Sequence, residues 1–223
     1  MTGIAQNLQA IGERLRAARG VTLLAVSKGQ SVERIREAAA AGQKAFGENY
    51  VQEALAKMRA VAALPLPGLE WHLIGPLQSN KTRPAAESFA WVQTITSEKI
   101  ARRLSEQRPE GLPPLNVLLQ VNVSGEATKS GIAPAGVEDL AEKISVMPRL
   151  RLRGLMAIPE PGAPRERYRE VKTLFEAMKA RFGFDTLSMG MSDDMALAIA
   201  EGATMVRVGT AIFGSRQKAK NVA

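Results

Sequence analysis

The feature that most constrains the fold is an alternation of short, β-branched or apolar segments with longer helical patterns, repeated eight times along the 223 residues. This alternation is typical of parallel β/α construction. The expected strands are 21–27, 45–48, 70–75, 91–95, 115–123, 152–158, 186–189 and 204–209. The expected helices are 2–18, a helix starting at Ser31, one that ends near 63, 80–88, 98–106, 134–146, 165–181, 192–201 and a last turn after 209.

Eight such units predict one closed (β/α)8 TIM barrel in the α/β class, with an additional helix at 2–18. Single barrels commonly have about 200 to 250 residues, so we expect one domain, residues 1–223. A doubly wound open sheet is the alternative. Its first strand-to-helix turn usually carries G-x-G-x-x-G, which the segment VSKGQS (26–31) does not supply.

Composition excludes several kinds of site. The chain has no cysteine, which excludes disulfides, thiolate zinc sites and a cysteine nucleophile. Its single histidine argues against a histidine-rich metal site, and we expect no metal. The first twenty residues form an amphipathic pattern rather than a signal peptide, and no segment reaches membrane-spanning length. These features predict a cytoplasmic protein that does not bind membranes.

The net charge of +8 does not by itself identify a partner. Basic residues are mostly interleaved with acidic ones, and only two tryptophans and two tyrosines are available for base stacking. We therefore interpret the charge as solvated helix faces and expect no nucleic-acid partner. No exposed apolar stripe stands out, which favours a monomer.

Polar residues gather where the predicted strands end, which is where barrel sites lie. They are Lys28, Glu48, Asn49, His72, Gln78, Ser79, Asn80, Lys81, Asn122, Lys129, Ser188, Arg207 and Thr210. Lys28 follows an apolar strand and has no acidic neighbour in sequence. A desolvated lysine there can act as a nucleophilic amine, but spacing alone equally allows a lysine that extends from the barrel rim into water.

Two glycine-containing loops follow the last two predicted strands, SMGMS (188–192) and VGTAIFG (208–214). Such loops often hold phosphate in barrels, because glycine lets backbone N–H groups approach an anion. Gly190, Gly209 and Thr210 fit this role. Asp193 and Asp194 would repel phosphate, so we expect both to point away.

Arg207 shares a strand face with Met205 and Gly209. Spacing leaves three roles open: a phosphate counter-ion, a partner for a cofactor ring nitrogen, or a salt bridge with a carboxylate such as Glu48. His72 is interpreted as a packed residue beside Trp71 rather than a catalytic base.

Six blocks resemble, in order, the pyridoxal phosphate homeostasis protein family, whose fold is similar to the N-terminal barrel of alanine racemase. The blocks are AVSK (25–28), FGENYVQEALAK (46–57), WHLIGPLQSNKTR (71–83), GLMAI (154–158), LSMGMSDDM (187–195) and VRVGTAIFG (206–214). The resemblance implies that pyridoxal 5'-phosphate (PLP) is the cofactor and that it forms a Schiff base, an internal aldimine, with Lys28.

Carried over by position, the resemblance places Asn49 near the cofactor ring and Arg207 opposite the pyridine nitrogen. It implies that phosphate is bound by Ser188, the backbone of Met189, Gly190 and Met191, and then Gly209 and Thr210. One departure is Gly29-Gln30, where family members commonly carry threonine or another polar residue. This departure puts the shape of the adjoining loop in question.

The resemblance further implies a non-catalytic protein of vitamin B6 metabolism that buffers PLP or supplies it to apo-enzymes. An arginine at the ring nitrogen disfavours ring protonation and so weakens carbanion stabilisation. Racemisation also needs acid/base groups on both substrate faces, and Tyr50, the tyrosine nearest the site, is expected to pack against its helix. The alternatives are a PLP-dependent amino-acid racemase and a cofactor-independent class I aldolase acting through Lys28.

Overall fold

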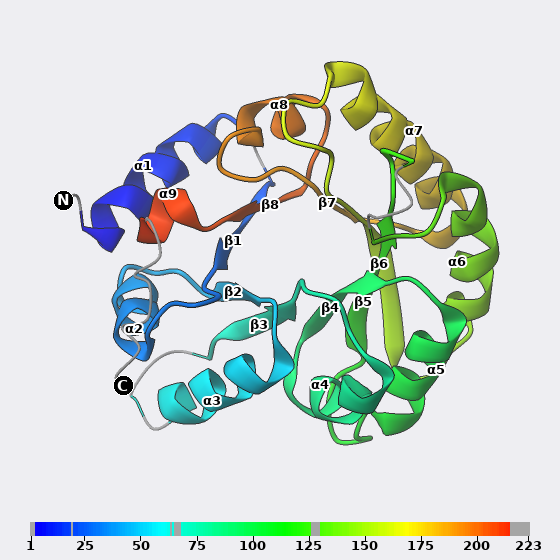
Figure 1. The fold of residues 1–223 in the computed structure, drawn as a ribbon, viewed down its shortest axis with the longest axis horizontal. Helices are drawn as coiled ribbons and strands as arrows, with labels where there is room; N and C mark the ends of the chain where they lie inside the picture. Colours follow the sequence, from blue (N-terminus) through cyan, green and yellow to red (C-terminus); the bar gives the residue numbers. More distant parts are fainter. Residues whose placement is uncertain (1–2, 19, 63, 65–67, 126–129, 215–223) are drawn as a thin grey trace, which may run out of the picture.

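The computed structural model describes residues 3–18, 20–62, 64, 68–125 and 130–214. Its sheet is a closed barrel in which each strand pairs in parallel with the next and the last pairs with the first (Figure 1). The strands are β1 (Thr22–Val26), β2 (Ala45–Glu48), β3 (Glu70–Leu73), β4 (Trp91–Ile95), β5 (Leu115–Val121), β6 (Leu150–Ala157), β7 (Thr186–Ser188) and β8 (Met205–Val208). The predicted TIM barrel is confirmed and the open sheet is excluded.

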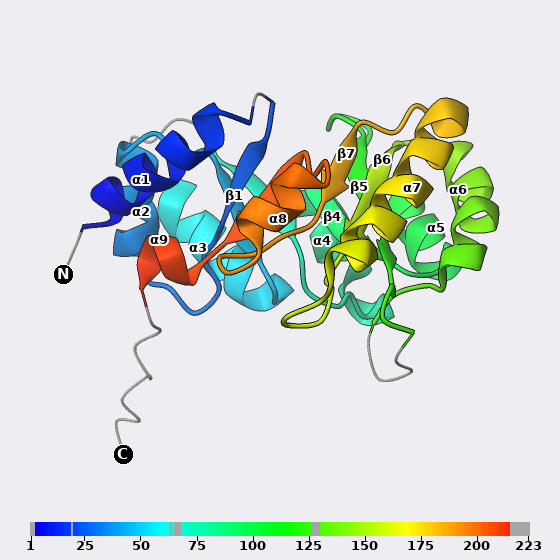
Figure 2. The same ribbon diagram turned by 90° about the horizontal axis from the view of Figure 1, so that it is seen from above.

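Helices surround the barrel and connect successive strands (Figure 2). They are α1 (Ile4–Arg16), α2 (Val32–Ala40), α3 (Val51–Ala62), α4 (Thr82–Ser88), α5 (Glu98–Gln107), α6 (Val137–Ser145), α7 (Arg165–Phe182), α8 (Met195–Ala200) and α9 (Thr210–Phe213). Short 3-10 turns, η1 (Ser79–Lys81) and η2 (Pro134–Gly136), precede α4 and α6. The additional N-terminal helix is present as predicted.

Two helices begin three residues later than predicted: α6 begins at Val137, after the 3-10 turn η2, rather than at residue 134, and α8 begins at Met195 rather than at residue 192. Asp194 accounts for the later start of α8, because its carboxylate accepts the N–H of Met191 at 2.5 Å and holds residues 191–194 in a turn. A side chain that binds the backbone locally competes with helix formation in this way.

Apolar side chains fill two regions. The main core lies between the barrel and its helices, while the barrel interior contains two smaller clusters, one around Leu24 and Met205 and the other around Trp91 and Met156. Polar side chains are buried inside the barrel as well, His72, Gln93, Ser188 and Arg207 among them. No helix in the described ranges is long and apolar enough to cross a membrane.

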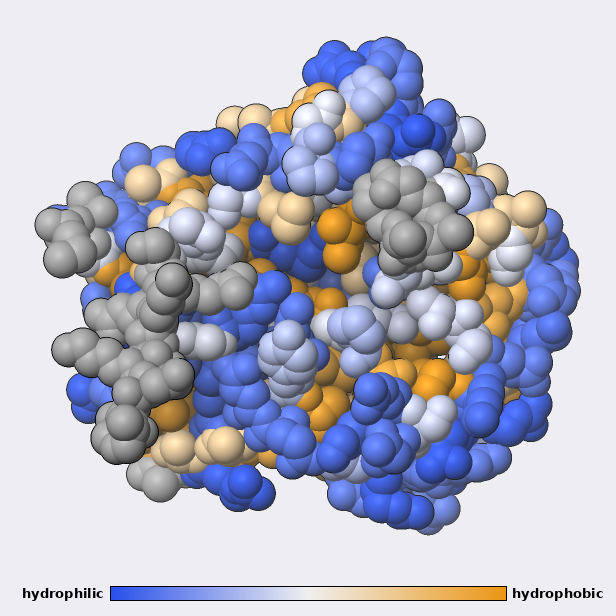
Figure 3. All heavy atoms as spheres, viewed as in Figure 1, coloured by the Kyte–Doolittle hydropathy of each residue, from blue (hydrophilic) through white to orange (hydrophobic). Residues whose placement is uncertain are grey.

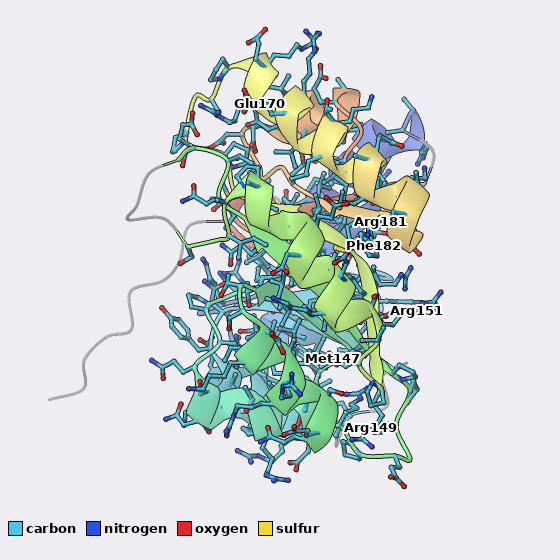
Figure 4. All side chains as sticks on the ribbon, turned by 90° about the vertical axis from the view of Figure 1, so that its right-hand side faces the viewer. Met147, Arg149, Arg151, Glu170, Arg181 and Phe182 are labelled. Carbon is cyan, nitrogen blue, oxygen red and sulfur yellow. The ribbon has the colours of Figure 1, made fainter. Side chains whose placement is uncertain are left out.

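Helices α6 and α7 lie side by side on the face drawn in Figure 4. Arg181, near the end of α7, pairs with Glu138 and Glu142 of α6, and its guanidinium lies 5.2 Å from the centre of the Phe182 ring. All three charged side chains are about half exposed, so we assign these pairs only a small share of the stability.

Gly154 lies on β6 opposite Thr186 of β7. Its φ is 152°, and a Cβ added there would lie 1.9 Å from the carbonyl oxygen of Thr186. The pairing of β5 with β6 is also irregular here, between Val117 and Leu118. Only glycine fits this position without moving the sheet.

We therefore predict that Gly154→Ala lowers the free energy of unfolding by about 3 kcal/mol, because the methyl group must displace sheet backbone. The matched control is Gly12→Ala in α1, where an added Cβ meets nothing within 4 Å. This control should stabilise the protein by about 0.5 to 1 kcal/mol through helix propensity. Urea unfolding followed by circular dichroism measures both, and equal midpoints for the two variants would contradict the assignment.

Candidate functional site

A cavity of about 340 Å³ opens at the end of the barrel where the strands finish. This face is turned to the viewer in Figure 3, which shows a hollow near its centre. The volume suits a small organic ligand. The cavity is lined by Val26, Lys28, Gln30, Asn49, Ile74, Ile158, Met191, Ser192, Asp193, Arg207, Gly209, Thr210 and Gly214.

Six of the nine residues predicted to bind a cofactor lie on this wall: Lys28, Asn49, Met191, Arg207, Gly209 and Thr210. The other three lie beneath the wall. Ser188 and Met189 are fully buried, and a Cβ on Gly190 would lie 2.5 Å from the Cβ of Ala198. Ser188 therefore lies below Arg207 instead of on the cavity wall.

Lys28 lies in a tight turn after β1. The N–H of Gln30 donates to the carbonyl of Ser27 at 3.0 Å, and Gly29 has φ 70°, a left-handed conformation that favours glycine. The N–H of Gly29 donates to Glu53 of α3 at 2.6 Å. Gly29 and Gln30, the two residues that differ from the usual family sequence, thus form a turn that is anchored to α3. This turn places Lys28 on the cavity wall.

A buried charged cluster lies under this turn. The Lys57 ammonium donates to Glu48 at 2.8 Å, to Glu53 at 2.6 Å and to the Ser27 carbonyl at 2.7 Å. Glu48 also accepts the Ser27 hydroxyl at 2.6 Å. Burial raises the pKa of Glu48, while the hydrogen bonds from Lys57 and Ser27 oppose that rise. The cluster ties down the backbone on both sides of Lys28.

Arg207 extends from β8 into the barrel and is only 4% exposed. Its guanidinium donates to the Ser188 hydroxyl and to the carbonyl of Ala157, each at 2.8 Å. Burial lowers the pKa of Arg207 to about 10, against an opposing effect of Asp194, so the side chain is charged at neutral pH. The alternative salt bridge to Glu48 is not formed, because Glu48 is held by Lys57.

The two aspartates after β7 lie differently. Asp194 accepts the Tyr168 hydroxyl at 2.6 Å and the Met191 N–H, and it is not on the cavity wall. Asp193 does line the cavity, so the expectation that both aspartates point away is wrong for Asp193. The N–H of Met189 donates to the Met205 carbonyl and that of Met191 to Asp194, so two of the backbone donors expected for phosphate in this loop are already used within the protein.

Gly209 and Thr210 bring a short helix to the cavity. Helix α9 begins at Thr210, directly after β8. The N–H groups of Ile212 and Phe213 donate to the Gly209 carbonyl at 3.0 and 2.9 Å, which leaves those of Thr210 and Ala211 available to a ligand. A Cβ on Gly209 would lie 3.3 Å from the carbonyl oxygen of Val26, so the backbones of β1 and β8 approach closely here. This turn fits the predicted role of an anion site.

Other sequence predictions have mixed outcomes. His72 is packed as predicted, fully buried and stacked on Trp91 with ring centres 5.1 Å apart. Tyr50 is 66% exposed, so its predicted packing is wrong; it lies at the end of the β2–α3 turn, where its side chain extends into solvent. The remaining strand-end candidates, Gln78, Ser79, Asn80, Lys81 and Asn122, do not line the cavity. Lys129 lies outside the described residues.

Sequence reasoning missed several residues of the site. Gln30, Ser192 and Asp193 line the cavity through loop geometry, which no periodic pattern indicates. Lys57 and Glu53 are spaced like an ordinary surface ion pair on a helix, and only the fold shows Lys57 to be 6% exposed. One signal was present: Gln93 and Thr94 are polar residues in WVQTI, a strand buried along its whole length.

No group of three or more histidine, cysteine, aspartate or glutamate side chains in the described part of the chain could hold a metal ion. The cavity instead combines a lysine, a buried arginine, an amide and a helix start. This donor set suits an anionic organic ligand with a group that reacts with an amine.

Comparison with known proteins agrees with this chemistry. Residues 2–217 match the family model described as alanine racemase, N-terminal domain. The chain is 55% identical to the pyridoxal phosphate homeostasis protein of Pseudomonas aeruginosa, with 97% of each chain covered. It is 52% identical to the protein of that name from Escherichia coli K12, covering 99% of this chain and 100% of the relative.

Solved structures extend the comparison. PipY of Synechococcus elongatus, in a structure with PLP bound, superposes with a TM-score of 0.86 at 38% identity, covering 95% of this chain and 100% of PipY. Alanine racemase of Corynebacterium glutamicum shares the fold, with a TM-score of 0.71 at 18% identity over 97% of this chain and 61% of the enzyme. By sequence and by structure, the chain belongs to the pyridoxal phosphate homeostasis protein family.

Proposed function

We propose that this chain binds PLP covalently through Lys28 in the cavity and serves to buffer it or to supply it to apo-enzymes. The observation that carries the proposal is that Lys28 and the buried Arg207 line one cavity of about 340 Å³ at the end of the barrel. The family relationship and the PLP bound by PipY support the identity of the ligand.

The residues present fit the cofactor. Lys28 supplies the amine that binds its aldehyde carbon, and the Gly209–Thr210 turn supplies backbone N–H groups for its phosphate. The side-chain oxygen of Asn49 is buried without a hydrogen-bond partner in the protein, and Asn49 lines the cavity. The carboxylate of Asp193 would repel phosphate, so we expect phosphate to bind away from this part of the wall.

The chemistry of Arg207 supports carriage rather than turnover. PLP supplies an electron sink when its ring nitrogen is protonated. Arg207 retains its positive charge at neutral pH, and a cation facing that nitrogen lowers its affinity for a proton. The arginine therefore holds the ring in place while making carbanion formation less favourable.

The two tyrosines support the same conclusion, since neither is placed as a buried base. Tyr168 donates its hydroxyl to Asp194, and burial together with this carboxylate raises the pKa of Tyr168 well above its usual range. Tyr50 is 66% exposed, in the turn that follows Asn49. We infer a non-catalytic protein, with a PLP-dependent racemase as the alternative.

We further propose that residues 1–223 form one domain that acts as a monomer in the cytoplasm, with apo PLP enzymes as partners and no nucleic acid or membrane. The exposed large apolar residues in the described ranges come from separate elements and support the monomer; they are Tyr50, Leu112, Val146, Ile158 and Met191.

Lys28→Ala should abolish covalent binding of PLP, because no other amine would replace Lys28 at its position on the cavity wall. The measurement is the absorbance band of the lysine-bound cofactor, followed by borohydride reduction and peptide mass spectrometry. The matched control is Lys99→Ala, an exposed lysine on α5, which should keep the band. A stoichiometric adduct on another lysine in Lys28→Ala would refute the site, and a wild-type protein without any adduct would refute the function.

If the protein delivers PLP directly, the PLP-loaded protein should reactivate an apo PLP enzyme faster than PLP dissociates from the loaded protein. Stopped-flow activity assays with and without a trap for free PLP measure the two rates. Equal rates would reject direct transfer and leave only buffering through free PLP.

The racemase alternative gives a different outcome. Solvent deuterium would then enter the α-carbon of alanine or another amino acid at a rate above that with free PLP. Such exchange, lost in Lys28→Ala, would overturn the non-catalytic assignment.

Glu53→Ala should slow covalent capture of PLP by Lys28 about three- to tenfold and destabilise the fold by about 1 to 2 kcal/mol, since Glu53 no longer accepts hydrogen bonds from the Gly29 N–H and from Lys57. The variant removes the acceptor for Gly29 N–H but keeps the buried Lys57–Glu48 pair. Glu87→Ala, which removes an exposed ion pair with Arg83, is the control. An unchanged capture rate would show that the turn does not need this anchor.

A further inference from the structure

A chain of hydrogen bonds crosses the barrel interior from the cavity to the opposite rim. Arg207 Nη1 lies 2.8 Å from Ser188 Oγ, Ser188 Oγ 2.7 Å from Gln93 Oε1, Gln93 Nε2 2.9 Å from His72 Nδ1, and His72 Nε2 2.8 Å from Glu70 Oε1. These side chains come from β8, β7, β4 and β3. The chain starts at a cavity residue and ends at Glu70, the first residue of β3, whose side chain is 47% exposed.

The chemistry of the two ends fixes the direction of every bond. Arginine can only donate, so Ser188 accepts from Arg207 and donates its own hydrogen to the Gln93 oxygen. The Gln93 amide nitrogen then faces His72, whose Nδ1 must accept. His72 therefore carries its hydrogen on Nε2 and donates it to the Glu70 carboxylate.

The opposite arrangement fails at Ser188. If the Gln93 amide were turned around, its nitrogen would face Ser188, and the serine hydrogen would have no acceptor in the chain because Arg207 cannot accept. The present arrangement also lets Gln93 Nε2 donate to the sulfur of Met205 at 3.1 Å. One direction of donation therefore satisfies the whole chain.

Burial makes the chain strong. His72, Gln93 and Ser188 are fully buried, and hydrogen bonds in such surroundings polarise one another. Burial also lowers the pKa of His72, which agrees with a neutral ring whose Nδ1 accepts. Stacking on Trp91, at 7° between the ring planes, fixes the orientation of the imidazole.

The position of these groups is unusual for a barrel, because its interior is generally filled by branched apolar side chains. Buried polar groups are costly unless every one is hydrogen-bonded. Each group in this series of hydrogen bonds has a partner, and the series ends at the Arg207 guanidinium beside the cavity. The arrangement fixes Arg207 from below, together with the Ala157 carbonyl.

We propose that Gln93 and His72 are positioning residues that, through Ser188, orient Arg207 toward the ring of bound PLP and couple its guanidinium to the Glu70 carboxylate. The proposal deepens the proposed function and rests on it for the identity of the ligand. Neither Gln93 nor His72 lines the cavity, so each acts through Arg207.

His72 provides a direct readout, because it is the single histidine of the chain. In ¹⁵N-detected NMR of the untagged, uniformly labelled protein, the ring should show hydrogen on Nε2 and none on Nδ1 at pH 7. Loading with PLP should shift both ring nitrogens through the chain. Hydrogen on Nδ1, a charged ring, or no change on loading would overturn the proposal.

Two variants test whether Ser188 and Gln93 connect Arg207 to His72. In Ser188→Ala and Gln93→Met, saturating PLP should no longer shift the His72 nitrogens, the absorbance band of bound PLP should move, and its dissociation constant should rise about tenfold. The matched control is Ser105→Ala, another buried serine, whose hydroxyl donates to the Pro148 carbonyl away from the cavity. It should behave as wild type, and a loss of binding equal to that of Ser188→Ala would indicate general destabilisation instead.

A conservative pair of substitutions at His72 adds a second check. His72→Asn keeps an amide oxygen that can accept from Gln93, whereas His72→Phe removes every acceptor while keeping a ring to stack on Trp91. The absorbance band should be retained in the first variant and moved in the second, and identical bands would refute the role of His72. A wild-type protein that binds no PLP would instead refute the proposed function, with the His72 tautomer still testing the chain of hydrogen bonds.

Discussion

The pairing of β1 with β8 is the constraint on which the rest of the structure depends. Leu24 pairs with Arg207 and Ala25 with Val208, and the N–H of Thr22 donates to Thr204 at 2.8 Å. This seam closes the barrel and brings the turn that carries Lys28 beside the Gly209–Thr210 turn. An amine from one end of the sequence and the Gly209–Thr210 turn from the other thereby line one pocket.

Two clusters of buried polar side chains support the pocket from different sides. Outside the barrel, Lys57 ties the Lys28 turn to Glu48 and Glu53. Inside it, Gln93 and Ser188 hold Arg207. Both arrangements bury charge or polar atoms that would destabilise the fold if left unpaired. The stability of the barrel and the geometry of its site therefore depend on the same hydrogen bonds.

The sequence predicted the fold well, because the period of the apolar residues changes visibly between strand and helix. Six of the nine residues expected to bind a cofactor line the cavity, since strand ends meet at one rim of a parallel barrel. The sequence could not show that Ser188 lies below the wall, or that Asp194 turns toward Tyr168 while Asp193 does not. These differences depend on single side-chain contacts across the barrel, which local patterns do not encode.

The β1–β8 seam also determines when the pocket can form during protein synthesis. Domains begin to fold from the N-terminal side as the chain emerges from the ribosome. Here the first strand must wait for the last, and α9 follows that strand directly and packs against α1, where Asn7 donates to the Ile212 carbonyl at 2.8 Å. A nascent chain that has not reached β8 lacks Arg207, Gly209, Thr210 and Gly214 of the pocket wall, so the pocket is complete only after the last strand and α9 have joined the barrel.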